Sequence, residues 1–309
     1  MIFIKFILII FNFLAILQSA DYSSYGFDIF NISMDAKTSS LGGIPSLNSM
    51  SIDKVYSLNE FHKKNKSLFS YGESYAGTIN YFQISRIIWD SNKSKLGVSL
   101  LHKKINDIPN TQAAWVDLGS PINQSDIDYN NITFYSDQQI ALVFLYSYQS
   151  RIGDIGIKIK PFYTSIINYN SFGVSMDFGF NRVLSDKVTL GLSAKNLLSI
   201  NKWDTGETYY LYPTLSSLII YSYNDSHILT ELSISPSILE KYSYKIGYEN
   251  NIYKKVNFQL GYSSISSISL GFSLNHKNKD FYYSFTPNLN NILLGHNHQF
   301  SILLDLPNN

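Results

Sequence analysis

Residues 172–181 read FGVSMDFGFN, and this stretch shows the kind of fold most clearly. Large apolar side chains alternate there with small or polar ones, a repeat of two residues that is typical of a β-strand with two unlike faces. One face carries Phe172, Val174, Met176, Phe178 and Phe180, and the other carries Gly173, Ser175, Asp177, Gly179 and Asn181. A helix would repeat its apolar positions every three or four residues, so the stretch is predicted to be a strand.

The same alternation recurs along the chain. Six further stretches place apolar side chains on one face and mostly Gly, Ser, Asn or charged side chains on the other: residues 140–148, 155–160, 188–193, 242–249, 256–263 and 268–275. Helical periodicity is nearly absent after residue 50. The chain is therefore predicted to be all-β.

Three features indicate that the apolar face contacts lipid and not a water-excluded core. The predicted strands run to about 10 residues or more, the length that a tilted membrane strand needs. Tyrosines lie near strand ends, as an interfacial aromatic girdle requires: Tyr146, Tyr148, Tyr221, Tyr223 and Tyr262. The opposite face suits a crowded polar lumen. The sequence therefore favours a transmembrane antiparallel β-barrel over a secreted sandwich or solenoid.

The strand count supports a barrel. Counting back from the C-terminus gives 14 strands, near residues 297–306, 280–286, 267–276, 255–264, 241–250, 227–236, 214–224, 187–197, 171–183, 151–165, 136–150, 95–105, 76–90 and 67–70. Bacterial single-chain barrels use even numbers. With this count the three longest connections, 106–135, 198–213 and 287–296, all fall at one end of the barrel, as expected for long outer loops.

Composition excludes several functions. Of 309 residues, 24 are Lys or Arg and 23 are Asp or Glu, so the net charge of +1 gives no basis for nucleic-acid binding. The chain has no Cys, which excludes disulfides, thiolate metal sites and a thiol nucleophile. Only 15% of the residues are charged, against roughly a quarter in soluble domains.

The N-terminus indicates export. Residues 1–20 read MIFIKFILIIFNFLAILQSA, with Lys5 before an apolar run and small residues at the end, the pattern of a secretory signal peptide. A transmembrane anchor is the alternative, but a span needs about 20 apolar residues and this run is shorter. Any membrane crossing by the mature chain is then expected to use strands.

Three stretches carry a resemblance to a known family. They are FDIFNISMDAKTSSLGGIPSL (27–47), residues 152–199, and FYYSFTPNLNNILLGHNHQFSILLDL (281–306). The matching positions are Asp35, Ala36, Lys37, Leu41, Gly42 and Gly43; Lys158, Asp177, Gly179, Gly191, Asn196 and Leu197; and Tyr282 or Tyr283, Leu294, Gly295, His298 and Ser301. Together they resemble the PorV/PorQ-like outer-membrane proteins, a group similar to the FadL superfamily of 14-stranded barrels.

The resemblance implies a domain organisation. It places the segment after the signal peptide within or against the barrel, so we expect a signal peptide at 1–20, a plug-like segment at 21–66 and an outer-membrane barrel at 67–306. The plug motif would consist of Asp35, Lys37, Leu41, Gly42 and Gly43, whose small residues permit close backbone approach.

The resemblance also implies a function in the outer membrane of a Gram-negative-type bacterium. A PorV- or PorQ-like protein would take part in type IX protein secretion or surface attachment, with secretion components or exported cargo as partners. The alternative is a FadL-like channel for hydrophobic solutes such as long-chain fatty acids, and the third hypothesis is a purely structural barrel. In each case outer-membrane lipid surrounds the chain.

No enzyme chemistry is expected. The motif G-x-S-x-G is absent, and no cofactor is predicted. His296 and His298 could share a strand face, yet no third ligand lies near them in the sequence, so no metal site is predicted.

Two sets of residues are candidates for ligand or partner contact. Lys158, Asp177 and Lys195 fall on predicted lumen faces, where they either line a solute path or form structural ion pairs, because a lone buried charge is expensive. Trp115 and Ile108 lie in the long outer connection. They either contact a partner or hydrophobic ligand, or pack the loop over the barrel mouth.

Overall fold

The structure is a computed structural model that describes residues 28–46, 66–115, 127–236, 242–253, 255–265, 267–288 and 295–305. The predicted signal peptide (1–20) and Leu294 of the terminal motif lie outside these residues.

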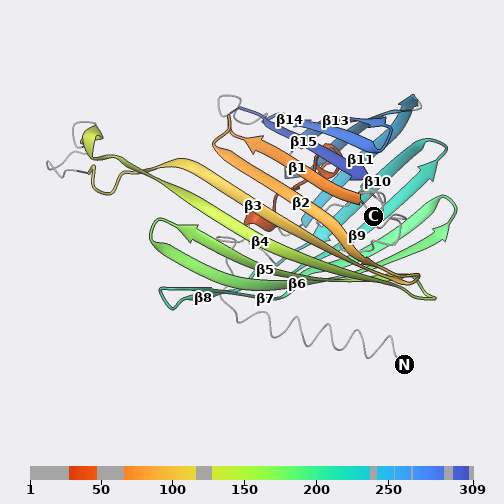
Figure 1. Cartoon of the computed structure of the whole chain (residues 1–309), viewed down its shortest axis with the longest axis horizontal. Helices are drawn as coiled ribbons and strands as arrows, with labels where there is room; N and C mark the ends of the chain where they lie inside the picture. The colour runs from red at the N-terminus through yellow and green to blue at the C-terminus, as the bar shows by residue number, and fades with distance from the viewer. Residues whose placement is uncertain are drawn as a thin grey trace.

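Fourteen long antiparallel strands in the described chain form a closed barrel (Figure 1). A further strand of two residues, β8, pairs with β7. In chain order the strands are β1 (Lys66–Ser74), β2 (Ile79–Asp90), β3 (Ser94–Asn110), β4 (Thr133–Gln149), β5 (Asp154–Ile166), β6 (Tyr169–Ser185), β7 (Val188–Trp203), β8 (Thr208–Tyr209), β9 (Thr214–Tyr223), β10 (Ser226–Ile234), β11 (Tyr242–Tyr253), β12 (Val256–Ser263), β13 (Ser267–His276), β14 (Lys279–Thr286) and β15 (Asn297–Asp305).

Pairing of the first strand with the last closes the barrel. β1 is hydrogen-bonded to β15 from Lys66↔Asp305 to Glu73↔His298, and to β2 on its other edge. Each other long strand pairs with its two sequence neighbours, so no long strand is left as a free sheet edge over its whole length. The predictions of an antiparallel barrel and of 14 strands are confirmed.

The barrel has two unlike ends. The three longest connections, 111–132, 204–213 and 287–296, meet at one end, here called the loop end. The opposite end, here called the turn end, joins strands through short connections such as 91–93 and 277–278, and also holds Lys66 and Asp305. The predicted placement of all three long connections at one end is confirmed.

Several strands are longer than the sequence predicts. β1 runs to Ser74 instead of residue 70, and β7 runs to Trp203 instead of residue 197. The predicted connection 106–135 contains the ends of β3 and β4, which project beyond the barrel as a two-stranded ribbon (Figure 1). The ends of these strands are rich in polar residues, so the alternation of apolar and polar side chains does not reveal them. Backbone hydrogen bonding between strands does not require an apolar face.

The exterior of the barrel is an apolar belt. Along β4 the outward residues Ile140, Leu142 and Phe144 are 37–41% exposed, whereas Ala141 and Val143 between them are at most 2% exposed. Outward aliphatic and aromatic side chains are similarly exposed on most other strands. An exterior of this kind is what a membrane-spanning barrel presents to lipid.

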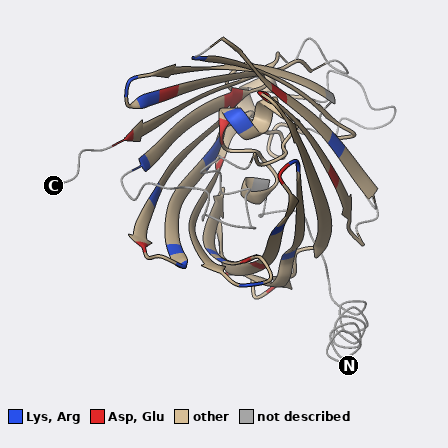
Figure 2. Ribbon diagram, turned by 90° about the vertical axis from the view of Figure 1, so that its right-hand side faces the viewer, with Lys and Arg blue, Asp and Glu red and all other residues tan. Residues whose placement is uncertain are grey.

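Residues 28–46 lie inside the barrel, as the view along it shows (Figure 2). They form a 3-10 helix, η2 (Asp28–Phe30), and one turn of α-helix, α2 (Ala36–Ser40), which lies against β12 to β15. The Asp35 side chain caps α2 by accepting a hydrogen bond from Thr38 N.

The helices of the described chain are short. Besides η2 and α2 there is a 3-10 turn, η4 (Tyr129–Asn131), at the tip of the β3–β4 ribbon. None of these helices is long and apolar enough to cross a membrane.

The outward position of the apolar belt predicts the effect of a charge on it. Leu260 lies in the middle of β12 and Tyr242 at the loop end of β11, and both face outward. In a bilayer, Leu260→Arg is expected to lower the free energy of unfolding by about 2–4 kcal/mol and Tyr242→Arg by about 0–1 kcal/mol, because the cost depends on depth. Urea unfolding of the protein in lipid vesicles measures both. If Leu260→Arg is neutral or stabilising, the belt faces water.

Candidate functional site

The lumen has two unlike walls. Inward side chains on β2 to β5 include a contiguous apolar group, whereas those on β11 to β15 are mostly Ser, Gln and Gly. The apolar group, here called the apolar strip, consists of Tyr81, Leu101, Ala141, Val143 and Phe162. The register places Leu101 opposite Ala141 and Ala141 opposite Phe162, so three of these side chains form one row across three strands.

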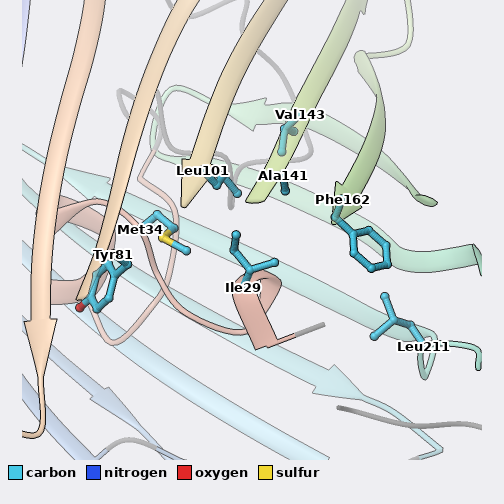
Figure 3. Packing of buried hydrophobic residues seen from close by; sticks show 8 residues of the cluster. All are labelled: Ile29, Met34, Tyr81, Leu101, Ala141, Val143, Phe162 and Leu211. Atoms are coloured by element: carbon cyan, nitrogen blue, oxygen red, sulfur yellow. The ribbon is translucent and has the colours of Figure 1, made fainter. Parts of the chain in front are cut away.

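Residues from outside the barrel wall complete this apolar surface. Ile29 and Met34 of the N-terminal segment and Leu211 of the β7–β9 connection point toward the strip (Figure 3). All three side chains are at most 5% exposed. The N–H of Ile29 donates to Gln139 Oε1 at 2.9 Å, which fixes η2 beside the strip. The lumen therefore contains an apolar region bounded by the wall, the N-terminal segment and a loop.

A second set of inward side chains is charged and paired. Asp177 on β6 lies 2.7 Å from Lys160 Nζ and 3.8 Å from Lys158 Nζ, and its carboxylate also accepts the Asn196 N–H at 2.8 Å. Lys160 Nζ is 4.6 Å from the centroid of the Phe30 ring, a cation–π distance. The structure thus brings together two of the predicted site residues, Lys158 and Asp177, as a buried ion pair.

Lys195 lies in a bulge next to this cluster. Met176 pairs with Leu198 and Phe178 pairs with Ala194, so three residues of β7 oppose Asp177 alone. Asn196, at the centre of the bulge, has a φ of 56°, and its N–H reaches the Asp177 carboxylate. Lys195 interacts electrostatically with Glu231 on β10. The bulge therefore turns Lys195 toward a different carboxylate.

One ion pair and one hydrogen bond tie the N-terminal segment to the far wall. Lys37 Nζ on α2 lies 2.8 Å from Glu249 Oε1, and both side chains are only 10% exposed. Lys245 Nζ lies 2.9 Å from Glu231 Oε1 and donates to the carbonyl oxygen of Gly43 at 3.1 Å. These contacts hold the predicted plug residues Lys37 and Gly43 against β10 and β11.

Glycines on the barrel wall form the surface on which the segment rests. A Cβ on Gly261 would overlap the amide nitrogen of Gly42 and the carbonyl carbon of Leu41. Gly42 and Gly43 have φ values of 72° and 80° and end α2, and Gly42 N donates to Ser269 Oγ at 3.1 Å. Close backbone contact thus requires glycine on both sides. Leu41 is fully buried beside it against Leu218, Ile220 and Leu229.

Trp115 and Ile108 lie outside the lumen, in the β3–β4 ribbon. Ile108 is half-buried and pairs with Tyr135 in the β3–β4 ribbon, beyond the last pair of β2 with β3, Ile79↔Ile105. Trp115 is 48% exposed and bridges to Ile127 near the ribbon tip. The structure does not join them to Lys158, Asp177 or Lys195, so the predicted contact residues form two separate regions. Their role as a contact surface stays a prediction.

The apolar strip is the feature that sequence reasoning missed. The alternation predicts a small or polar inward face, yet residues 140–146 read IALVFLY, so both faces of β4 are apolar there. This interruption of the alternation is the signal that could have located the strip. It is visible only when the inward residues Ala141, Val143 and Leu145 are read as a set of their own.

The histidine pair faces outward at the loop end. Tyr283 Oη and His298 Nδ1 are 2.9 Å apart, and the rings of Phe285 and His296 are 5.3 Å apart. Within the described residues, no group of three or more His, Asp or Glu side chains is placed to hold a metal ion. His298 therefore packs in the β14–β15 hairpin.

No family model matches the sequence, and no curated relative is similar to it. Solved structures are similar in fold. The toluene transporter TbuX of Ralstonia pickettii has a TM-score of 0.60 at 10% identity, over 89% of this chain and 99% of its own. The monoaromatic hydrocarbon channel CymD has a TM-score of 0.57 at 10% identity, over 89% and 98%.

The toluene transporter TodX of Pseudomonas putida has a TM-score of 0.51 at 9% identity, over 92% of this chain and 93% of its own. The TM-scores show a shared fold, and at identities of 9–10% the comparison shows no more than that. The shared fold is that of an outer-membrane barrel. The assignment to the PorV/PorQ group is not confirmed.

Matched glycine substitutions test how closely the segment must approach the wall. Gly261→Ala is expected to displace the segment, because its Cβ would overlap Gly42 N. A Cβ on Gly247 would be 3.1 Å from Leu41 O, so Gly247→Ala requires only a small shift and should have a small effect. Overpacking of this kind costs about 1–3 kcal/mol. Limited proteolysis of the folded barrel should therefore cut the 28–46 segment several-fold faster in Gly261→Ala than in Gly247→Ala. Equal cutting would show that the segment does not rest on Gly261.

The Lys37–Glu249 pair predicts a strong dependence of stability on both partners. Lys37→Met leaves Glu249 buried without its cation and is expected to lower the free energy of unfolding by about 3–5 kcal/mol. Lys37→Met with Glu249→Met should recover most of this loss. The matched control is Lys66→Met at the Lys66–Asp305 pair, 3.5 Å long with side chains 23% and 25% exposed, where the loss should stay below about 1 kcal/mol. Urea unfolding measures all three, and equal losses for the single variants would contradict the burial argument.

Proposed function

We propose that this chain is a non-enzymatic channel of the bacterial outer membrane that passes small hydrophobic molecules. The observation that supports this most directly is the apolar strip inside the lumen, with Leu101, Ala141 and Phe162 in one row. A hydrophobic solute gains about 25 cal/mol for each Å² of apolar surface that leaves water.

The arrangement of the N-terminal segment fits this function. The Lys37–Glu249 ion pair, the hydrogen bond from Lys245 to Gly43 and the glycine contacts hold the N-terminal segment against β11 to β15. Ile29 and Met34 of the same segment lie on the apolar strip. In the proposed channel, residues 21–66 act as a plug after removal of residues 1–20, and solutes move along the strip beside Ile29 and Met34.

The similar structures add support of a general kind. TbuX and TodX are described as toluene transporters and CymD as a monoaromatic hydrocarbon channel. These descriptions belong to those proteins, and at 9–10% identity they support the transport hypothesis only through the shared fold. The type IX secretion hypothesis gains no support from them. Transport of hydrophobic solutes, the alternative in the sequence analysis, therefore becomes the main proposal.

Uptake of toluene into proteoliposomes tests the proposal. The protein is expected to raise the initial rate above that of protein-free vesicles. Leu101→Asn should lower the protein-dependent part by about tenfold, because the amide removes apolar contact that the solute gains on the strip. Leu229→Asn is the matched control, since Leu229 is also buried in the lumen but lies under Leu41 on the opposite wall. It should leave the rate within about twofold, provided that the variant barrel shows the same heat-modifiable band in gels.

Two outcomes would contradict the proposal. One is a protein-dependent rate that Leu101→Asn and Leu229→Asn change equally, since the strip would then have no special role. The other is no protein-dependent toluene uptake, together with capture of exported proteins that share a C-terminal domain, which would return the secretion hypothesis to first place.

A further inference from the structure

We infer that the lumen holds a recognition site for a neutral hydrogen-bonding group on the solute, formed by Asn201 and Ser171 at the end of the apolar strip. The inference rests on the proposed function, because the site lies along the same path. It narrows the solute from any hydrocarbon to a small apolar molecule that carries one hydroxyl or amide group.

The register places Asn201 in line with the apolar row. Phe162 is opposite Gly173, and Gly173 is opposite Asn201, so the row that begins at Leu101 continues to Asn201 on β7. A Cβ on Gly173 would overlap the Phe162 ring, which shows that this ring lies over Gly173 and fills the space between β5 and β7. Asn201 is therefore the next inward side chain along the wall after Phe162.

Ser171 lies beside Asn201. It is opposite Trp203, two residues further along β7, which makes Ser171 and Asn201 diagonal neighbours on one face of the sheet. Diagonal neighbours are about 7–8 Å apart, a separation that one small group can bridge. The Phe162 ring lies over Gly173, which is opposite Asn201, and Leu211 N donates to Ser199, two residues from Asn201. The polar pair therefore borders the apolar cluster.

Both polar side chains are buried without a partner. Asn201 is 0% exposed, and neither its Nδ2 nor its Oδ1 has a hydrogen bond; Ser171 is 3% exposed, and its Oγ has none. Buried polar groups are nearly always hydrogen-bonded, so a whole unpaired amide next to an unpaired hydroxyl is unusual. Polar side chains nearby on the same two strands are satisfied: Ser175 donates to Asn196, and Ser199 accepts from Leu211 N.

The chemistry of the pair fits a neutral group. An amide offers one acceptor and two donors, and a hydroxyl both donates and accepts. Neither group is charged, and the charge of Lys160 on β5 is paired with Asp177. A hydroxyl or amide on the solute can donate to Asn201 Oδ1 while accepting from Asn201 Nδ2 or Ser171 Oγ. Its apolar body then lies against Phe162, Leu211 and Ile29.

Cyclohexanol and cyclohexane form a matched pair of probes, since they differ by one hydroxyl and do not absorb light used for Trp fluorescence. With Trp89→Phe and Trp115→Phe, two residues on the outer surface, Trp203 is left as the single reporter beside Ser171. The full chain in lipid nanodiscs is titrated with each probe. The quantity compared is the ratio of the two affinities, which cancels partition of the probes into lipid.

Asn201→Leu is expected to lower the ratio of cyclohexanol to cyclohexane affinity about tenfold, and Ser171→Ala a few-fold. Ser216→Ala is the control, because Ser216 is also buried in the lumen, at 7% exposed, but is hydrogen-bonded to Ser233. It should leave the ratio unchanged. If Asn201→Leu does not fold, Ser171→Ala decides the result.

The outcomes separate this inference from the proposed function. If both probes bind and the ratio is the same in wild type, Asn201→Leu and Ser171→Ala, the pair holds internal water only, and the inference is wrong while the channel stands. If neither probe binds, the proposed function fails and takes the inference with it. A ratio that falls only in the Asn201 and Ser171 variants supports the site.

Discussion

Closure of the sheet is the constraint on which the rest of this structure depends. A strand in lipid cannot leave its N–H and C=O groups unpaired, and only a sheet without edges meets this condition. Pairing of β1 with β15 provides it, from Lys66↔Asp305 at the turn end to Glu73↔His298 near the loop end. Every long strand then has two neighbours. The alternation along each strand therefore divides its side chains into outward and inward ones, in the first and last strands as in the others.

Closure also creates an interior that must be filled. Eight strands enclose little more than their own side chains, and sixteen or more leave an aqueous channel, so 14 strands leave room for an additional segment. Residues 28–46 occupy part of that room. Lys37, Gly42 and Gly43 make polar and glycine contacts on the wall of β9 to β15, and Leu41 packs there against Leu218, Ile220 and Leu229. On the other side, Ile29 and Met34 pack on the apolar strip.

Buried charge in this lumen is organised by pairing. The Asp177 carboxylate lies within 4 Å of two lysines and accepts a backbone N–H. Glu231 pairs with Lys245 and also interacts with Lys195, and Glu249 pairs with Lys37. Such pairs specify geometry more than they add stability, since desolvation offsets much of the attraction. In contrast, Asn201 and Ser171 are buried beside the apolar cluster without partners. Among the described residues, Asn201 thus differs from the charged groups, because both polar atoms of its side chain are buried without a hydrogen bond.

The sequence by itself determined the strand architecture, because a repeat of two residues depends only on the order of side chains along one strand. It was enough to predict 14 strands, an antiparallel barrel and the inward position of Lys158, Asp177 and Lys195. Only the tertiary structure decided which inward residues lie in one row across neighbouring strands. The row from Leu101 through Ala141 and Phe162 to Asn201 joins residues up to 100 positions apart, and its members meet because of register. Alternation predicts which face of the sheet a residue occupies. The register of one strand against the next is set by strand pairing, by closure of the barrel and by the bulge at Asn196.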